Sequence, residues 1–280
     1  MLLVDKPAGI TSHDVVSVAR RALGERRIGH AGTLDPFATG LLVLLTGHAT
    51  RVLPYVDGEP KEYEATIRWG AETDTDDATG TITRETAALP AREDIDAGIA
   101  DLTGPIEQVP PDFSAKQVDG RRAHAAARSG APLALAAVPV HVHSWLVREH
   151  RGTETDVTIV CGGGTYIRAL ARDLGRAANS AAHLSALRRT RSGPFEVSRA
   201  SSFADLRDGR AIMRSPREAI PSLPEQRVSA SDAARLARGM RVDADVAGER
   251  AALVSEEGAL LAIAERSDSQ WQPRVVLAHG

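Results

Sequence analysis

Residues Gly29–Gly40 read GHAGTLDPFATG, with three glycines and one proline among twelve residues. Glycine and proline interrupt both helices and strands, so this composition predicts a structured loop. Ile28 precedes the loop, and the apolar run Leu41–Leu45, a buried strand or helix segment, follows it. The loop therefore presents one histidine and one aspartate, His30 and Asp35, between apolar flanks.

The local pattern does not assign a chemistry to these two residues. Asp35 precedes Pro36, and a residue before proline avoids the α region, which directs its carboxylate outward. Asp-Pro turns are common, however, and on this pattern alone a purely structural role is favoured for Asp35. A hydrogen-bonded loop histidine is likewise the simpler interpretation of His30.

Outside this loop the sequence alternates many short strands with a few helices. Residues Tyr63–Trp69 alternate apolar and polar side chains, which predicts a half-buried strand. Similar patterns predict strands at Leu2–Val4, Val138–Val147 and Asp156–Val160, and helices from Thr11 or Ser12 to Gly24, over Ile95–Leu102 and over Tyr166–Arg176. This order predicts an α+β fold with a mixed, largely antiparallel sheet and flanking helices.

The composition changes after Phe203. Residues 215–225 contain three prolines and are typical of a linker. Beyond them a short helix and three short strands predict a small β-rich module of about 55 residues, which is marginal for a core of its own and is expected to dock on the main body. We therefore predict a main domain over residues 1–222 and a small C-terminal domain over residues 223–280.

The overall composition is that of an ordinary globular protein, with 280 residues, 42% hydrophobic and 25% charged. No apolar run approaches the ~18 residues of a membrane span, and no signal peptide opens the chain. The only cysteine, Cys161, excludes an internal disulfide and a cysteine-rich zinc site. We therefore expect a soluble, cytoplasmic protein.

The net charge of −3 conceals two segments of opposite charge. Glu72–Asp101 contains nine carboxylates and two arginines, whereas Arg168–Arg199 contains seven arginines and two carboxylates. Clustered arginines can bind a polyanion, because affinity depends on local rather than net charge. They are equally compatible with solvated helix faces, so the charge pattern permits a nucleic-acid partner without proving one.

Three further patterns have some features of a binding site. Gly162–Gly164 followed by Tyr166 and Arg168 could bind a phosphate group, but no P-loop or dinucleotide motif is present. Thr73–Gly80 is acidic, yet it lacks the ligand and the glycine that an EF-hand requires at its fifth and sixth positions. A metal site at His141 and His143 would lack a third ligand.

Several segments together resemble motifs of the TruB family, the tRNA pseudouridine-55 synthases. Gly29–Gly40 resembles the catalytic loop of the family, with Asp35 at the position of the catalytic aspartate. The other matching segments are Val4–Ser12, Lys61–Tyr63, Thr73–Gly80, Gln108–Lys116, Gly164–Arg168 and Leu187–Thr190. The tail resembles, more distantly, the variable PUA-like C-terminal domain of actinobacterial members.

The resemblance implies an isomerase that converts uridine 55 in the T-loop of tRNA to pseudouridine, with the tRNA T-arm as its partner. Residues 1–222 would form the catalytic pseudouridine synthase domain, and residues 223–280 a PUA-like RNA-binding domain. The reaction breaks a glycosidic bond, rotates the base and forms a carbon–carbon bond, so we expect no cofactor and no metal. We also expect a monomer without membrane association.

The resemblance assigns catalytic roles to three residues. Asp35 would be the catalytic carboxylate, which either attacks the sugar C1′ or abstracts the C2′ proton. Arg168 would pair with Asp35 and orient it. Tyr63 would stack on the flipped uracil and assist the late deprotonation of C5. By pattern alone, Tyr63 is an ordinary strand aromatic that faces the core.

The resemblance assigns binding or supporting roles to five more residues. Tyr166 and Leu187 would form walls of the pocket, although Leu187 by itself is typical of a core residue. His30 would fill the gap left by the flipped base, Lys6 would support the catalytic loop, and Asp77 would complete an ion network with the arginine.

Two positions depart from the family pattern, since Phe113 and His124 stand where tyrosine is usual or common. These changes are expected to alter RNA contacts rather than the chemical step. A protein of another class also fits the same scaffold, namely a tRNA-binding or tRNA-folding chaperone without catalysis. A third hypothesis is an enzyme that binds a nucleotide phosphate at the Gly162–Gly164 turn.

Overall fold

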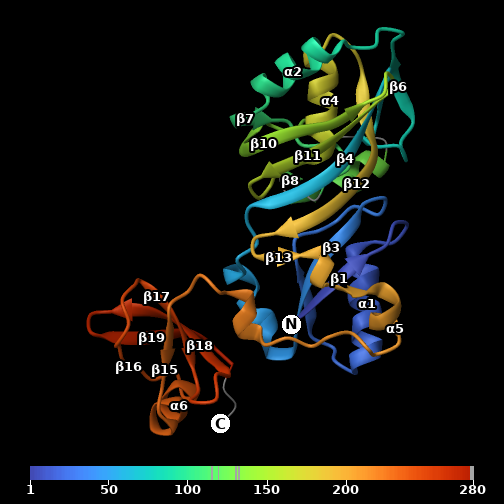
Figure 1. The fold of residues 1–280 in the computed structure, drawn as a ribbon. Coiled ribbons are helices and arrows are strands. Elements are labelled where there is room, and N and C mark those ends of the chain that lie inside the picture. The colour runs from blue at the N-terminus through green and yellow to red at the C-terminus, as the bar shows by residue number, and fades with distance from the viewer. Residues whose placement is uncertain (115, 119, 130, 132, 278–280) are drawn as a thin grey trace. The chain divides into compact units, whose positions relative to one another are not determined.

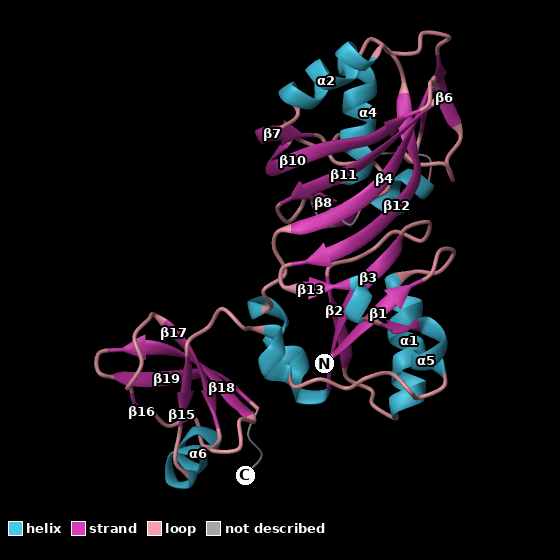
Figure 2. Cartoon of the chain, in the orientation of Figure 1, coloured by secondary structure: helices cyan, strands magenta, loops and turns pink. Residues whose placement is uncertain are grey.

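The computed structural model describes residues 1–114, 116–118, 120–129, 131 and 133–277, and it divides into two compact units (Figures 1 and 2). The first unit contains residues 1–36, 40–58 and the chain from Pro194 onward, and the second contains residues 37–39 and 59–193. Most of the Asp35 loop, as we call Gly29–Gly40, thus belongs to the first unit. Its residues 37–39 belong to the second.

The first unit contains a mixed sheet centred on β1 and β3. β1 (Leu2–Lys6) is parallel to β14 (Ser201–Ser202) and antiparallel to β3 (Thr39–Thr46), whose other edge pairs with β2 (Ile28–Ala31). The apolar run Leu41–Leu45 is therefore a strand. It lacks alternation because one face packs against helices α1 (Ser12–Leu23) and α5 (Phe203–Arg207) and the other against a second apolar cluster.

Helix α1 (Ser12–Leu23) begins and ends at the residues that the sequence predicts. Thr11 is the N-cap, and its side chain and that of Asp14 each accept a hydrogen bond from the other's backbone N–H, which forms a capping box. Gly24 ends the helix in the left-handed region, with φ of 62°. Because Thr11 caps the helix, the side chain of Ser12 is available for another partner.

The C-terminal part of the first unit is a five-stranded sheet in the order β15-β17-β18-β19-β16, packed against α6. Trp271 lies fully buried in a core of this module, and Ala252 and Ile263 join a second core with Leu3 and Val43. The module therefore docks on the body of its unit, as its small size predicts. Its elements are β15 (Glu225–Arg227), α6 (Ala230–Ala237), β16 (Val242–Asp243), β17 (Arg250–Val254), β18 (Leu260–Ser267) and β19 (Gln270–Val276).

The segment predicted as a linker, residues 215–225, is a packed connection. Ala219 and Ile220 are fully buried, and the guanidinium of Arg217 donates to the carbonyls of Ile220 and Leu223. Prolines here shape an ordered turn, and the domain boundary at residue 222 stays a prediction because the two compact units do not follow it. The other short elements of this unit are η1 (Gly47–Tyr55), β13 (Phe195–Glu196), η2 (Val197–Arg199), α5 (Phe203–Arg207) and η3 (Pro216–Ala219).

The second unit is built on an antiparallel sheet in the order β12-β4-β11-β10-β7. Helix α4 packs on β12, and α2 packs on α4 (Figure 1). In β4 the apolar residues of the predicted alternation are buried and the polar residues between them are not. These elements are β4 (Lys61–Trp69), α2 (Arg92–Asp101), β7 (Gly104–Gln108), β10 (Val138–His150), β11 (Glu154–Cys161), α4 (Ile167–Ala177) and β12 (Ala182–Ser192).

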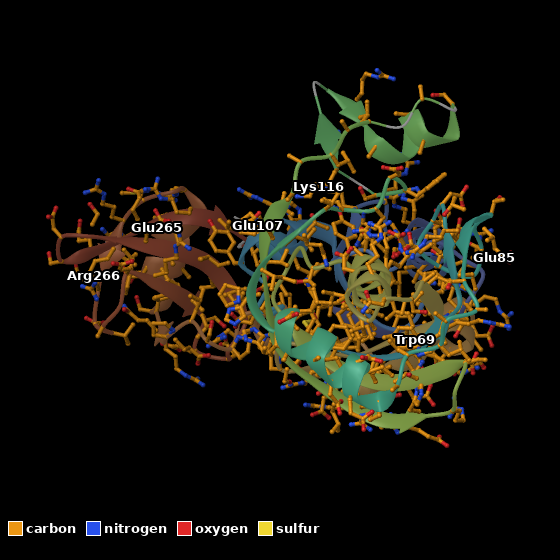
Figure 3. All side chains as sticks on the ribbon, turned by 90° about the horizontal axis from the view of Figure 1, so that it is seen from above. Trp69, Glu85, Glu107, Lys116, Glu265 and Arg266 are labelled. Atoms are coloured by element: carbon orange, nitrogen blue, oxygen red, sulfur yellow. The ribbon has the colours of Figure 1, made fainter. Side chains whose placement is uncertain are left out.

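Two small hairpins complete the second unit. β5 (Ala71–Thr73) and β6 (Ile82–Glu85) flank the acidic turn, as we call Thr73–Gly80. β8 (Gln117–Val118), β9 (Arg121–Arg122) and α3 (Ala123–Arg128) form a segment that stands away from the sheet of its own unit, with Lys116 at its base (Figure 3). The side chain of His124 lies outside what the structure describes.

The architecture confirms the predicted fold class, an α+β fold with mixed, largely antiparallel sheets, flanking helices and a small β-rich C-terminal module. Among the described residues, no helix has both the length and the apolar character needed to cross a membrane.

Candidate active site

The Asp35 loop leaves β2 and returns into β3. His30 is half-buried in β2 opposite Leu44, and Gly32 and Gly40 adopt φ values of 89° and 102°, which only glycine adopts without strain. Asp35 lies between these two glycines in sequence, and its side chain is half-buried.

A buried hydroxyl holds the backbone immediately before Asp35. Ser12 is 2% exposed, and its Oγ accepts from the N–H of Leu34 at 2.8 Å and donates to the carbonyl of Leu34 at 3.0 Å. A single side chain thus satisfies both backbone groups of the residue that precedes the aspartate.

A buried ammonium group holds the backbone immediately after the aspartate. Lys6 is 0% exposed, and its Nζ donates to the carbonyls of Pro7, Ile10 and Pro36 at 2.9, 2.7 and 3.3 Å. The N–H of Gly9 donates to the same Pro36 carbonyl at 2.8 Å. Lys6 thus contacts the backbone of the Asp35 loop, and its role in the site stays a prediction.

The end of the Asp35 loop makes contacts within the second unit. The Thr39 hydroxyl donates to the carbonyl of Leu187 at 3.5 Å and accepts from Arg188 Nη1 at 3.4 Å. Leu187, on β12, is one of the two residues predicted as walls of the pocket. The end of the loop therefore lies beside β12.

The glycine turn that could have bound a phosphate is covered by a carboxylate. A Cβ on Gly163 would collide with Oε1 of Glu59, which lies over the turn. The N–H of Tyr166, the N-cap of α4, is bound by Oε1 of Gln108 at 2.9 Å, and Gln108 Nε2 returns a bond to the Tyr166 carbonyl. A phosphate here would meet a carboxylate of like charge, which disfavours the nucleotide-phosphate reading.

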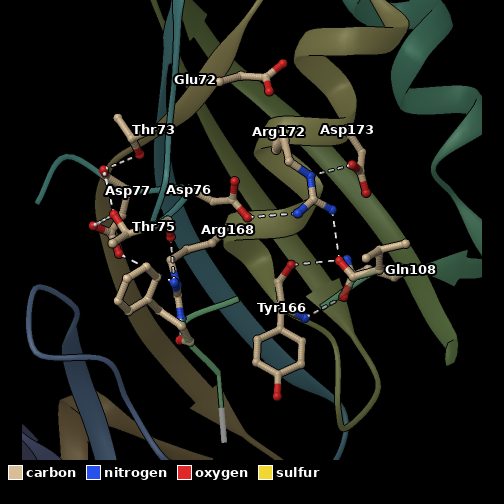
Figure 4. A network of polar contacts seen from close by, with 12 residues as sticks. Glu72, Thr73, Thr75, Asp76, Asp77, Gln108, Tyr166, Arg168, Arg172 and Asp173 are labelled. Atoms are coloured by element: carbon tan, nitrogen blue, oxygen red, sulfur yellow. Dashed lines mark hydrogen bonds and ion pairs between the residues drawn. The ribbon is translucent and has the colours of Figure 1, made fainter. Parts of the chain in front are cut away.

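Arg168 is buried, and its guanidinium donates to backbone carbonyls of two distant segments. Its Nη1 donates to the Thr75 carbonyl at 2.6 Å, and its Nη2 donates to the Phe113 carbonyl at 3.0 Å (Figure 4). The expected partner Asp77 forms an ion pair with Nη1 at 3.7 Å, which is longer than a hydrogen bond. Phe113 contributes through its backbone, so tyrosine in its place would offer the same carbonyl.

The hydrogen bonds of Asp77 lie within the acidic turn. Its Oδ1 accepts from the N–H of Thr79 at 2.9 Å and from the hydroxyls of Thr75 and Thr79 at 2.8 and 2.5 Å. Gly80 follows, and a Cβ there would collide with the side chains of Thr75 and Asp74. The turn therefore needs glycine at this position.

Arginines at intervals of four on α4 face the acidic turn. Arg172 Nη1 binds Asp76 Oδ2 at 2.9 Å, and Arg168 pairs with Asp77 (Figure 4). Arg176 binds Glu72, next to the turn, at 2.6 Å. Residues four apart lie on one helix face, so the three ion pairs follow the helix axis. We call this set of six residues the α4–turn network.

The environment shifts the pKa values in this network in opposite directions. Burial raises the pKa of Asp76 to about 6, although Arg172 and Arg168 act against it. The hydrogen bonds donated by Arg176 lower the pKa of Glu72. Outside the network, burial raises the pKa of Cys161 to about 11, so this thiol is protonated at neutral pH.

The network corrects the interpretation of the charge segregation. Three of the seven arginines in Arg168–Arg199 are engaged by carboxylates of the acidic segment, so they do not form a free phosphate-binding surface. The two oppositely charged segments are partners within one unit, which a linear charge count does not reveal.

Tyr63 and Leu187 lie on the same face of the sheet. Tyr63 on β4 is paired with Arg189 on β12, and Leu187 is paired with Ala65, so Leu187 and Tyr63 are diagonal neighbours. Both side chains are buried, whereas Tyr166 at the start of α4 is half-buried.

The eight residues predicted for the site fall into the two units. Lys6, His30 and Asp35 lie in the first, and Tyr63, Asp77, Tyr166, Arg168 and Leu187 lie in the second. Sequence reasoning did not single out four residues that hold these in place: Ser12, Asp76, Gln108 and Arg172. The four-residue spacing of Arg168, Arg172 and Arg176 was the signal in the sequence that could have identified Arg172.

In the part of the chain that the structure describes, no group of three or more His, Cys, Asp or Glu side chains is arranged to hold a metal ion. The rings of His141 and His143 lie with centroids 4.5 Å apart, as expected for neighbours on one strand face.

Comparison with known families matches nearly all of the region that carries these motifs. The model of the TruB family pseudouridylate synthase N-terminal domain matches residues 20–167, and that of the tRNA pseudouridylate synthase B C-terminal domain matches residues 168–223. The chain belongs to the TruB family. The two TruB matches meet at the first turn of α4, with Arg168 as the first residue of the second match.

Similar TruB proteins extend over the whole chain. The tRNA pseudouridine synthase B of Paenarthrobacter aurescens is 42% identical over 100% of this chain and 95% of that protein. The tRNA pseudouridine synthase B of Thermobifida fusca is 43% identical over 99% of this chain and 98% of that protein.

Solved structures share the fold at lower identity. An H/ACA ribonucleoprotein bound to a substrate RNA containing 2′-deoxyuridine has a chain that aligns with a TM-score of 0.73 at 22% identity, covering 99% of this chain and 84% of the other. An archaeal box H/ACA Nop10–Cbf5 complex aligns with a TM-score of 0.72 at 22% identity, covering 99% and 85%.

Proposed function

We propose that this chain converts uridine 55 in the T-loop of tRNA to pseudouridine, as a cytoplasmic monomer that uses neither a metal nor a redox cofactor. The observation that carries the proposal is the match over the full chain to relatives named tRNA pseudouridine synthase B. The Asp35 loop, held by buried side chains on both sides of its aspartate, agrees with it.

The reaction is an isomerisation in which every atom of the substrate is retained. The N1–C1′ bond breaks, the uracil rotates, and a C5–C1′ bond forms. The proton lost from C5 is balanced by one gained at N1. The uridine of a folded T-loop is stacked and must first leave the stack, at a cost of a few kcal/mol.

Asp35 is proposed as the catalytic carboxylate, acting either as a nucleophile at C1′ or as a base at C2′. The contacts of Ser12 and Lys6 with the residues on either side fix its backbone before the substrate arrives. Such preorganisation reduces the reorganisation needed in the transition state. A kinetic isotope effect from deuterium at C2′ separates the two paths, because only proton abstraction breaks that bond.

Arg168 is proposed to pair with Asp35 and to orient it, with Asp77 completing the ion network. The carbonyls of Thr75 and Phe113 limit the rotation of the guanidinium, which supports such an orienting role. A fixed arginine stabilises a carboxylate without a conformational search.

The flipped base is proposed to stack on Tyr63, in a contact worth ~1–3 kcal/mol, and Tyr63 assists the removal of the C5 proton. Tyr166 and Leu187 form walls of the pocket, and His30 fills the gap that the base leaves in the RNA. The diagonal placement of Tyr63 and Leu187 on one buried face supports a shared role.

The proposal is tested with an unmodified tRNA transcript and its isolated T-arm, incubated with the chain without added metal. Sequencing of pseudouridine should find conversion at position 55 in both RNAs. A matched transcript with cytidine at position 55 should show none at any position. Modification of a different uridine, with position 55 unchanged, would contradict the assignment of the substrate site.

A further inference from the structure

The middle ion pair of the α4–turn network is buried, as is the pair of Arg168 with Asp77. Asp76 is 6% exposed and Arg172 is 9% exposed, whereas the side chain of Arg176 in the outer pair is 55% exposed. Each of the three guanidinium nitrogens of Arg172 donates to an acceptor at 2.9 Å, namely Asp76 Oδ2, the Val109 carbonyl and Asp173 Oδ1 (Figure 4). The guanidinium therefore joins α4 to the acidic turn and to the segment after β7.

Asp76 lies between the two residues that contact Arg168. Thr75 supplies the carbonyl at 2.6 Å from Nη1, and Asp77 supplies the carboxylate at 3.7 Å. The carbonyl of Asp76 accepts from the N–H of Leu184 at 3.1 Å, which ties this point of the turn to β12. A displacement of Asp76 thus displaces the Thr75 carbonyl, because the two residues share a peptide unit.

The backbone of Asp76 increases its dependence on this ion pair. Its φ of 58° lies in the left-handed region, which costs energy for a residue with a side chain, although aspartate and asparagine tolerate it best. A strained residue keeps its conformation only where its surroundings fix it. The ion pair with Arg172 is one of the contacts that fix Asp76.

We propose that the Asp76–Arg172 ion pair is a positioning element of the active site, which holds the Thr75 carbonyl against Arg168 and so sets the orientation of that guanidinium. This inference rests on the proposed function, in which Arg168 acts beside the catalytic carboxylate. Asp76 and Arg172 touch no reacting atom, and they act through Arg168.

The charged groups around Asp76 indicate how the element responds to pH. From α4 it faces Arg172, Arg168, Asp173 and Arg176; from its own hairpin, Asp77 and Glu72; and from β12, His183, whose Nδ1 contacts the Ala71 carbonyl. Burial raises the pKa of Asp76 from the ordinary 3.8 to about 6. The ion pair is therefore complete above pH 6 and is lost as the pH falls through 6.

Activity and stability respond to this titration with opposite signs. The reaction should slow below pH 6, because the protonated Asp76 holds the turn less firmly. The contribution of Asp76 to the free energy of unfolding instead decreases as the pH rises from about 4 to about 6, because the folded chain binds the proton more tightly than the unfolded chain does. A residue with only a structural role would affect both in the same direction.

The test compares the wild type with Asp76→Asn, which keeps the size of the side chain and tolerates the left-handed backbone. With T-arm RNA as substrate, kcat of the wild type should be about tenfold lower at pH 5 than at pH 7.5, as expected for a group with a pKa near 6. The variant should lack this step and show kcat about tenfold below the wild type at pH 7.5, with KM within about twofold. Its melting temperature should lack the decrease between pH 4 and pH 6.

Arg176→Gln is the matched control, because it removes the exposed outer ion pair of the same helix face. It should leave kcat within about twofold of the wild type and the acid step unchanged. If Asp76→Asn does not fold, Arg172→Lys takes its place, since it keeps the charge and loses the forked contact; a several-fold decrease in kcat is expected.

Wild-type kcat and an unchanged acid step in Asp76→Asn, or wild-type kcat in Arg172→Lys, would overturn the inference and leave the proposed function standing. Inactivity of the wild type on the same RNA would overturn the proposed function and, with it, the positioning role.

Discussion

The Asp35 loop and the α4–turn network are held in place by different kinds of contact. In the first unit, a hydroxyl and an ammonium group bind the backbone of the residues on either side of Asp35. In the second unit, carboxylates and guanidinium groups hold the segment that contacts Arg168. The first arrangement consists of hydrogen bonds between these two side chains and backbone groups, whereas the second includes a carboxyl group whose pKa is about 6.

We expect the α4–turn network to be the part that responds to mild acid, because the pKa of Asp76 is raised to about 6. Ion pairs depend on the protonation state and, where they are exposed, on salt. Four substitutions test this difference.

Lys6→Met should have the largest effect, because it removes a buried donor that three backbone carbonyls share. We expect the free energy of unfolding to decrease by about 3 kcal/mol, measured by urea denaturation, and conversion to be lost. Arg21→Met, which replaces an exposed cation on α1, is the control and should cost less than about 0.5 kcal/mol. A cost below about 1 kcal/mol for Lys6→Met would show that the ammonium does not hold the loop.

Gly80→Ala should lower the free energy of unfolding by about 2 kcal/mol, because the new Cβ would collide with the side chains of Thr75 and Asp74 in the acidic turn. The Thr75 carbonyl would move relative to Arg168, so kcat should fall as well. Thermal unfolding and single-turnover assays measure the two effects. Thr81→Ala, an exposed change next to the turn that keeps the backbone contacts, should alter neither; an equal loss in both variants would contradict the steric account.

Ser12→Ala should cost about 1.5 kcal/mol, because both backbone groups of Leu34 lose their partner in a buried position. It should lower kcat without introducing a new pH dependence, since no ionisable group is involved. Thr11→Ala is the adjacent control: it removes the N-cap of α1 at a cost of about 1 kcal/mol and should leave kcat unchanged. Equal decreases in kcat for the two variants would mean that the hydroxyl of Ser12 has no particular role in the loop.

Glu72→Gln should have the smallest effect, about 0.5 kcal/mol, because the partners of this carboxylate, Arg176 and Arg84, are about half exposed. The pKa of Glu72 is lowered, so its stabilising contribution is present above pH 4.5 and is lost as the pH falls below that value. This sign is opposite to that for Asp76. Denaturation at pH 3.5 and pH 6, at low and high salt, should show a smaller difference between wild type and variant at pH 3.5 than at pH 6, and a smaller one at high salt than at low salt. A difference that is the same at both salt concentrations would contradict the contribution of the half-exposed arginines.

The parts of the fold that depend on local sequence could be predicted. The Thr11–Asp14 capping box and Gly24 set the ends of α1, and alternation identified β4. The composition of the Asp35 loop predicted an irregular segment between apolar flanks, and β2 and β3 frame it.

The contacts that hold the site depend on residues far apart in sequence and could not be predicted from local patterns. Ser12 binds a residue 22 positions away, Gln108 one 58 positions away, and Arg172 one 96 positions away. The arginine spacing on α4 marked a helix face, but only the folded chain shows that the acidic turn covers it. For the same reason, the linear charge pattern left open whether these arginines form a basic surface, and the folded chain places three of them in ion pairs.

The central claim is that Asp35 carries out the conversion of uridine 55, and its most direct test is the single-turnover rate of pseudouridine formation on T-arm RNA by Asp35→Asn. Asp101→Asn, an exposed change at the end of α2, is the control. We predict a wild-type rate for the control and, for Asp35→Asn, a rate lower by at least about 10³-fold with binding of the RNA retained. Conversion by Asp35→Asn at the wild-type rate would contradict the account, and binding without conversion by the wild type itself would favour the chaperone.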